Sequence, residues 1–447
     1  MYVNISFGFV YELLMKNKWL KALSVYNDRR MLIMLGLGFS SGFPLLLVFG
    51  TLNLWLDASG ISYALIGAFS LVKTPYSFKW MWSPIVDRVR LPFFERFGRR
   101  RGWALFTQLI MMFSIWGMST ISPAEHTCWL AAMAVFVTIA SASQDIVLDA
   151  FRIESFRDNE QGAGAAIFVL GYRFGMLFSG AVALWLAAYM SWNQVYFIMG
   201  FGALVGIITV LCSKEPVKDR RYKEPELKGN FSQRVKRFID KAVIEPFADF
   251  VKRPNWKLIL LFVFLYRMSD AYMGPMANVF YVKMGFSTLE IASISKLFGM
   301  AATILGGIVG GIVVNRFGIM KSLWICGVLQ GLTTLVFVAQ AYAGHNIYVL
   351  IGCISLDNIS GGMCVSAFVA YMSSLCNVAY TATQYALLSS LMSFARDVCA
   401  ATSGLVAALV SWDVFFIITS LMVLPGLFVL YILQSREGEL SAKVRLK

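Results

Sequence analysis

Two related stretches of the chain decide the fold: residues 83–101, SPIVDRVRLPFFERFGRRR, and residues 310–321, GGIVVNRFGIMK. In both, an apolar run ends with an acid or its amide directly before arginine, at Asp87 and at Asn315, and glycine and basic residues follow. The two stretches lie in corresponding places of the two halves of the chain. This repetition predicts a fold of two similar halves that follow one another along the chain.

The composition places this repeat in a membrane protein. Of the 447 residues, 58% are hydrophobic and only 14% are charged, and the mean hydropathy is +0.67. Because soluble proteins carry roughly 25% charged residues, an ordinary soluble enzyme, a disordered chain and a nucleic-acid-binding domain are excluded. The net charge of +14 is then best explained by lysine and arginine in cytoplasmic loops.

Apolar stretches of about 20 residues are long enough to cross a bilayer as helices. The sequence contains twelve of them, so it predicts an all-α integral membrane protein with twelve transmembrane helices. The spans are expected at residues 31–55, 61–84, 103–122, 128–150, 164–188, 194–212, 257–282, 288–314, 321–342, 347–371, 384–409 and 413–433.

Basic residues gather in the loops after the second, fourth and sixth spans and in the C-terminal tail. By the positive-inside rule, both termini are therefore predicted to be cytoplasmic. The first 30 residues do not resemble a signal peptide, and part of the basic linker, residues 231–252, has the apolar spacing of an amphipathic helix on the cytoplasmic face. The alternative is a solvated linker attracted to anionic lipid. The predicted units are residues 1–30 (N-terminal segment), 31–212 (first six-helix bundle), 213–256 (linker), 257–433 (second bundle) and 434–447 (tail).

The repeated stretch resembles the cytoplasmic loop motif of the major facilitator superfamily, G-x-x-x-[DN]-R-x-G-R-[KR], although an insertion interrupts it in the first half. The resemblance implies two six-helix bundles that rock around a site near the bilayer midplane. It also implies that the motif's acid caps a neighbouring helix and pairs with arginine, holding the cytoplasmic gate in one state. We therefore expect a gating role for Asp87, Arg88, Asn315 and Arg316.

Charges inside a span are costly, and their default interpretation is functional. In the fourth span, SASQDIVLDAFRIE places Asp145 and Asp149 one turn apart. Two such carboxylates repel, which favours protonation of one of them and suits a proton or cation site. The alternative is pairing with Arg152. In the fifth span, Arg173 beside Tyr172 could hold a substrate carboxylate or neutralise Asp145.

Further candidates lie in other spans. Arg267, a candidate for substrate binding, and Asp270, a candidate for proton coupling, stand three residues apart and can pair within the seventh helix or act in proton-driven switching. Lys73 shares a face with Tyr76 and Trp80, which suits a sugar-bearing anion or plain core packing. Asp357 is a further candidate for proton coupling, and the additional candidates for substrate binding are Lys296, Asn358, Arg396 and, at a possible helix break, Gly42.

Several longer stretches together resemble the AmpG muropeptide permeases over residues 31–430: FKWMWSPIVDR, SASQDIVLDAFR, GAGAAIFVLGYRFGMLFSG and DNISGGMCVSAFVAYMSSLCN. The resemblance implies a bacterial inner-membrane importer that uses the proton motive force to bring in anhydromuropeptides for cell-wall recycling. It implies functional roles for Gly42, Ala142, Gln144, Asp145, Asp149 and Arg173. Asp397 and the strongly basic linker depart from the family pattern.

Alternatives within transport are efflux of an amphiphilic drug and transport of a CoA thioester. A membrane-embedded cell-wall enzyme is the alternative from another class, but the sequence lacks HExxH and DDxxD patterns. We therefore expect no catalytic residues, no cofactor and no metal. The expected partners are the substrate, protons and the lipid bilayer, with no nucleic acid, and the protein is expected to be a monomer.

Overall fold

The computed structural model describes residues 24–62, 65–66, 69–216, 244–287 and 290–445. All regular structure within these ranges is helical, and no strand occurs there. In the same ranges, nine helical segments are long and apolar enough to cross a membrane. The all-α membrane class predicted from the sequence is confirmed.

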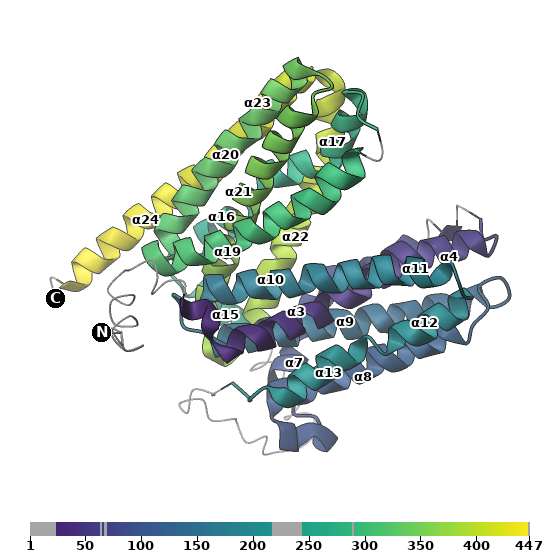
Figure 1. Ribbon diagram of the computed structural model, residues 1–447. Coiled ribbons are helices and arrows are strands. Elements are labelled where there is room, and N and C mark those ends of the chain that lie inside the picture. The colour runs from purple at the N-terminus through teal and green to yellow at the C-terminus, as the bar shows by residue number, and fades with distance from the viewer. Residues whose placement is uncertain (1–23, 63–64, 67–68, 217–243, 288–289, 446–447) are drawn as a thin grey trace, which may run out of the picture.

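The helices form two bundles, one from each half of the chain (Figure 1). The first contains α3 (Arg29–Leu46), α4 (Leu52–Ala58), α6 (Thr74–Phe78), α7 (Ser83–Arg88), α8 (Arg99–Ser119), α9 (Thr127–Ser155), α10 (Gln161–Leu177), α11 (Ala183–Ala187), α12 (Trp192–Gly200) and α13 (Ala203–Cys212). The second contains α16 (Trp256–Leu265), α17 (Met268–Lys283), α19 (Gly299–Phe317), α20 (Ile319–Ala343), α21 (Ile347–Ser374), α22 (Thr381–Leu409), α23 (Trp412–Leu421) and α24 (Val423–Arg445).

Three predicted spans, 61–84, 103–122 and 384–409, are not among the nine membrane-crossing candidates. Residues 69–88 form short helices instead of one long one, with prolines at the first turns of α6 and α7, where proline is tolerated. The other two spans are the long helices α8 and α22, which contain arginine and many small polar residues. The count of twelve spans therefore stays a prediction.

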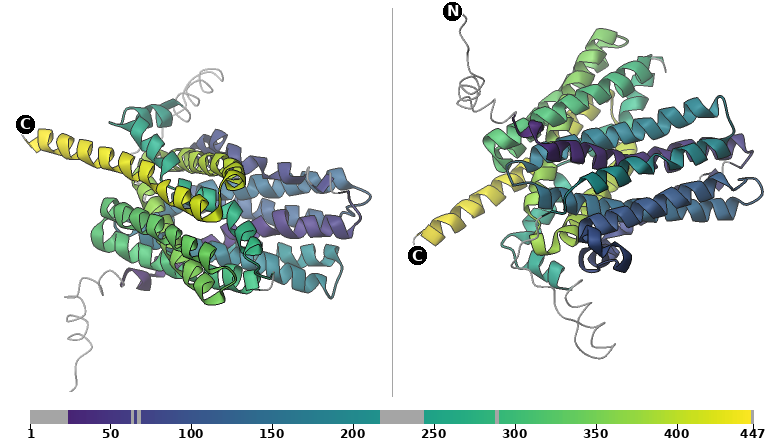
Figure 2. Two further views of the ribbon diagram at one scale, coloured as in Figure 1. Left: turned by 90° about the horizontal axis from the view of Figure 1, so that it is seen from above. Right: turned by 60° about the horizontal axis from the view of Figure 1, so that its bottom comes forward.

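The two bundles touch at one end and diverge toward the other (Figures 1 and 2). Between them, α10 packs against α19 and α21, and α22 packs against α9, α7 and α6. The start of α3 and the end of α24 lie at the end where the bundles touch, which we call the joined end. Helices from both bundles therefore meet at the joined end.

Glycines bring α3 and α10 into close contact. A Cβ atom on Gly42 would lie 2.0 Å from the backbone oxygen of Tyr172, and one on Gly171 would lie 2.0 Å from that of Leu35. Small residues that let helix backbones approach in this way are typical of membrane proteins. The structure thus places Gly42 in a helix crossing, which fixes the position of Tyr172 on α10.

The seventh predicted span is broken in the middle. Helix α16 ends at Leu265 and α17 begins at Met268, and Arg267 between them has non-helical backbone angles (φ −112°, ψ 22°). Breaks of this kind are tolerated at membrane depth where the backbone is enclosed by protein or lines a cavity.

Residues 1–23 of the predicted N-terminal segment and most of the predicted amphipathic helix at 231–252 lie outside the described residues. The described part of the linker ends in a short helix, α15 (Glu245–Val251), which packs against α22.

Candidate functional site

The first bundle presents a polar cluster built on α9. The Asp145 carboxylate accepts a 2.6 Å hydrogen bond from the hydroxyl of Ser41 on α3. One turn earlier, Ser141 accepts a 2.7 Å hydrogen bond from the hydroxyl of Tyr76 on α6. Two helices, α3 and α6, therefore converge on one face of α9, and Ser41 gives Asp145 a neutral hydroxyl partner.

Gln144 and Ala142 lie deeper in the bundle and are completely buried. The Gln144 amide donates to the hydroxyl of Ser40 at 3.1 Å, and Gln108 donates to the same hydroxyl at 3.3 Å. The carbonyl oxygen of Gln144 has no hydrogen-bond partner among the described residues. In this arrangement Gln144 and Ala142 contribute to packing between helices.

Asp149 pairs with Arg152 at 3.5 Å, as the alternative from the sequence proposed. Arg152 is only 1% exposed and reaches into the second bundle. It donates to Ser373 of α21 at 3.1 Å and lies 5.3 Å from the ring centre of Tyr385 on α22. Sequence reasoning did not assign Arg152 this connecting position, although a basic residue one turn after two acids was visible.

Tyr172 and Arg173 face the boundary between the bundles. Tyr172 lies within electrostatic range of both Asp145 on α9 and Arg396 on α22, and Arg173 lies near enough to Arg267 of the second bundle to repel it. The buried Nε of Arg173 has no partner among the described residues. No ion pair between Arg173 and Asp145 occurs in the described part of the chain, so the charge of Arg173 is left for other groups.

Lys73 stands at the edge of the same region. Its ammonium lies 5.0 Å from the ring centre of Phe49, whose ring packs edge-on against Tyr76. Lys73 and the neighbouring Trp80 are both exposed. The lysine is therefore accessible beside an aromatic surface.

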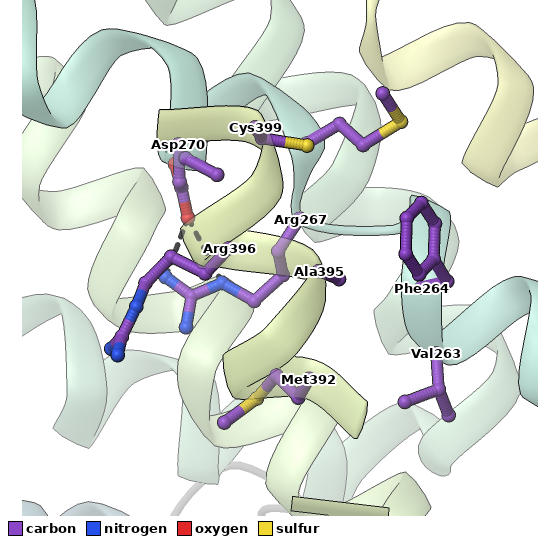
Figure 3. A pocket seen from close by; sticks show the side chains of 10 residues that line it. Val263, Phe264, Arg267, Asp270, Met392, Ala395, Arg396 and Cys399 are labelled. Atoms are coloured by element: carbon purple, nitrogen blue, oxygen red, sulfur yellow. Dashed lines mark hydrogen bonds and ion pairs between the residues drawn. The ribbon is translucent and has the colours of Figure 1, made fainter. Parts of the chain in front are cut away.

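The second bundle contains a cavity of about 200 Å³ between the break in the seventh span and α22. Figure 3 shows Arg267 and Asp270 on one wall and Arg396 on the other. The Nε and Nη2 atoms of Arg267 donate to the same oxygen of Asp270, at 3.0 and 2.5 Å. The break after α16 places Arg267 at the start of α17, and the three-residue spacing lets Asp270 reach back to it.

Asp357 and Asn358 connect helices within the second bundle. Asp357 accepts from Gln330 of α20 at 3.0 Å, and Asn358 accepts from the hydroxyl of Thr303 of α19 at 2.7 Å. Lys296 belongs to the π-helical segment Ile291–Phe298, and its side chain lies outside the described residues.

Asp87 lies at the joined end and is 1% exposed. It pairs with Arg100 of α8 at 2.8 Å and accepts bonds from the backbone N–H and the hydroxyl of Thr383, at 3.2 and 3.1 Å, in the first turn of α22. Although burial alone would raise the pKa of Asp87, the charges of Arg100 and Arg99 hold it below its usual value. An ionised carboxylate of the first bundle therefore caps a helix of the second.

The other residues of the repeated motif also lie at the joined end. Asn315 donates to the backbone oxygen of Asn159 at 3.1 Å, which connects α19 to the α9–α10 loop. The guanidinium of Arg88 lies 4.9 Å from the ring centre of Tyr380, next to α22. Arg316 stacks over the neighbouring ring of Phe317 at 5.5 Å.

The described residues contain no group of three or more His, Cys, Asp or Glu side chains that could hold a metal ion.

Comparisons with known proteins agree with this architecture. A model of the Major Facilitator Superfamily matches residues 78–396. The chain is 38% identical to the anhydromuropeptide permease of Escherichia coli (strain K12), over 92% of this chain and 81% of that protein. It is 36% identical to the putative transporter AmpG 4 of Rickettsia felis, over 92% of this chain and 98% of that protein.

Solved structures share the fold at low sequence identity. The proton:xylose symporter XylE bound to 6-bromo-6-deoxy-D-glucose superposes with a TM-score of 0.66 at 13% identity, over 91% of this chain and 94% of that one. The major facilitator transporter FucP in its outward conformation superposes with a TM-score of 0.64 at 12% identity, over 91% of this chain and 98% of that one.

Proposed function

Since the chain belongs to the AmpG family of the major facilitator superfamily, we propose that it imports anhydromuropeptides across the bacterial inner membrane, driven by protons. The observation that carries this proposal is the 38% identity, over 92% of the chain, to a protein named anhydromuropeptide permease. The proposal includes twelve transmembrane helices, one for each apolar stretch of about 20 residues. It places both termini in the cytoplasm, because loops rich in lysine and arginine favour that side. The joined end is then the cytoplasmic end.

The substrate would bind between the bundles, in the space bordered by α9, α10, α17 and α22. Tyr76, Ser141 and Ser41 supply hydroxyl groups of the kind that recognise sugars. Arg173 supplies a cation whose buried Nε is unpaired among the described residues, and arginine recognises carboxylates. A muropeptide carries both sugar hydroxyls and peptide carboxylates, so these groups match its two parts.

Transport would proceed by rocking of the two bundles. Asp87 with Thr383, and Arg152 with Ser373, connect the bundles at the joined end. These bonds favour the arrangement in which that end is closed. Opening it toward the cytoplasm requires that they break, which supports a gating role for Asp87.

Asp145 is the proposed proton carrier. Its carboxylate lies inside a predicted span and is bonded to the hydroxyl of Ser41, with no ion-pair partner among the described residues. The charge of Lys79 acts on Asp145 without forming an ion pair with it among the described residues. A carboxylate that is not ion-paired in a membrane gains stability when it is protonated. Protonation would also change the bond between α9 and α3, so it can be coupled to movement of the bundle.

The test is uptake of labelled anhydromuropeptide into proteoliposomes containing the purified protein, with and without an imposed proton gradient. Wild-type protein should accumulate the compound only with the gradient. The Asp145→Asn variant should lose this accumulation and keep exchange of labelled for unlabelled substrate, because exchange needs no net proton movement. Gradient-driven accumulation by Asp145→Asn, with unchanged pH dependence, would move the proton site elsewhere. Absence of any uptake by the wild type would refute the proposed substrate.

A further inference from the structure

We propose that the cavity between α17 and α22 binds a carboxylate of the substrate's peptide stem between Arg267 and Arg396, and that Asp270 occupies this place when no substrate is bound. The inference rests on the proposed function, because it assigns one part of a muropeptide to one part of the site.

The size of the cavity suits one end of a ligand. Its volume is about 200 Å³, whereas pockets that hold whole small molecules measure roughly 300–1,000 Å³. Most of the wall is apolar or small, including Val263, Phe264, Met392 and Ala395 (Figure 3). The arginine and aspartate side chains are the charged groups that line it. Such a wall can enclose the carbon chain of an amino acid while its charged end meets the guanidinium groups.

The charges favour an anion. Two guanidinium groups and one carboxylate line the cavity, which leaves one positive charge in excess. Asp397 approaches Arg396 at 3.4 Å, but it does not line the cavity, and both side chains are 65% exposed. An exposed pair of this kind contributes little, so Arg396 remains available. Outside the cavity wall, Arg173 of α10 lies near Arg267 and Asp357 of α21 lies near Asp270, so these two outer charges are opposite in sign and the excess positive charge is that of the wall.

The existing ion pair indicates which chemical group fits. Arg267 uses its Nε and Nη2 atoms, one edge of the guanidinium plane, to hold an oxygen of Asp270. Arginine typically presents such an edge to a carboxylate. The pair is accessible, with 30% of the Arg267 side chain and 23% of the Asp270 side chain exposed. A carboxylate entering the cavity therefore competes with Asp270 for the same donors.

This competition makes the internal pair and the bound substrate exclude one another. Entry of the substrate carboxylate breaks the pair of Arg267 with Asp270, and departure of the substrate lets the pair form again. The other charged groups around Asp270 are Arg396 on α22 and Asp357 on α21.

The experiment compares two labelled anhydromuropeptides in proteoliposomes: one with free peptide carboxylates, and the same compound with those carboxylates amidated. Arg396→Gln should raise the KM for the acid roughly ten- to hundredfold, the range expected for loss of a hydrogen bond to a charged group. It should leave the KM for the amide nearly unchanged. Because Arg396 is exposed, its substitution leaves the core intact. Arg396→Lys should retain part of the preference for the acid, and Arg436→Gln, which removes an arginine far along α24, should behave like the wild type.

Asp270 is tested by equilibrium binding of the acid and the amide at one pH. The Asp270→Asn variant should bind the acid more tightly than the wild type does, because the neutral side chain competes less well for Arg267, and its affinity for the amide should be nearly unchanged. Unchanged affinity for the acid would overturn the role of Asp270. Equal effects of Arg396→Gln on acid and amide, or no preference for the acid in the wild type, would overturn the carboxylate site and leave the proposed function standing. Uptake of neither compound by the wild type would refute the proposed function, and the peptide-stem assignment with it.

Discussion

The hydroxyl of Thr383 offers the most direct test of the joined end. It donates a 3.1 Å hydrogen bond to the buried carboxylate of Asp87, from the first turn of a helix in the other bundle. Thr383→Val removes this bond and keeps the shape of the side chain. It also leaves the ion pair of Asp87 with Arg100 in place, so no buried charge loses its counter-ion.

The expected effect follows from the nature of the acceptor. A hydrogen bond to a charged group contributes about 1.5–3 kcal/mol. The bond exists only while the bundles touch at the joined end, so this energy stabilises the closed arrangement alone. Its loss should shift the balance toward the open arrangement by roughly ten- to hundredfold.

The shift can be measured as a distance between spin labels at Asp158 and Lys321, with the cysteines that are not buried replaced. Both positions are exposed, and they flank the contact between Asn315 and Asn159 at the joined end. Thr383→Val should add a population with longer distances, and the wild type should show mainly the short ones.

Thr381→Val is the matched control. Thr381 begins the same helix, but its hydroxyl donates only to the nearby backbone oxygens of Asn377 and Val378. This variant should keep the wild-type distances. If Thr383→Val and Thr381→Val gave the same distribution, the bond to Asp87 would not control the closed arrangement, and the reasoning would be refuted.

Two further predictions concern stability. Gly42→Ala should lower the thermal unfolding midpoint, because the added Cβ would meet the Tyr172 backbone at 2.0 Å and overpacking typically costs about 1–3 kcal/mol. Gly50→Ala is the control and should have little effect, because the nearest atom to its Cβ lies at 3.6 Å. Equal unfolding midpoints for the two variants would contradict tight packing at Gly42. The hydrogen bond from the backbone N–H of Ser287 lowers the pKa of Glu290 most, and the bond from the Ser287 hydroxyl lowers it further. The ionised carboxylate therefore stabilises the fold at pH values above the pKa of Glu in the unfolded chain, about 4.3. This stabilisation is lost as the pH falls through the lower pKa of the folded protein. Wild type should therefore unfold at a higher temperature than Glu290→Gln at neutral pH and lose this advantage in acid, and an advantage that persisted in acid would contradict the assignment.

The sequence alone was sufficient to predict the fold class, an all-α membrane protein, and the protein family. Composition and apolar run length predicted the helical membrane fold, because a bilayer imposes both on any spanning helix. The repeated motif predicted two related halves, and the longer stretches predicted the AmpG family. The motif residue Asp87 lies between the bundles, but nothing in the sequence pairs it with Thr383, which lies 296 positions further along the chain. Such a partner depends on how the bundles pack and is not encoded locally.

Other features depend on tertiary structure in the same way. Periodicity cannot distinguish a polar residue that faces a cavity from one that faces another helix, and Gln144 faces Ser40 inside the bundle. The break at Arg267 also has no local signal, because the nearest proline, Pro275, lies inside α17. Arg267 and Asp270 could be paired from their spacing, but Arg396 joins them only because α22 packs against α17.

The distribution of charge at the joined end explains how a tightly closed interface can still open. Among the described residues, two charges that are only 1% exposed reach across it, and each has a counter-ion in its own bundle: Asp87 pairs with Arg100, and Arg152 pairs with Asp149. Their partners in the other bundle, Thr383 and Ser373, are neutral. Separating a buried ion pair leaves an uncompensated charge and costs roughly 3–5 kcal/mol, whereas water can replace a hydroxyl donor. Opening therefore breaks the bonds of these two charges to neutral groups while each keeps its counter-ion. The ion pair of Arg88 with Glu245 of α15, at 3.8 Å, is exposed on the Glu245 side, where water can replace the partner.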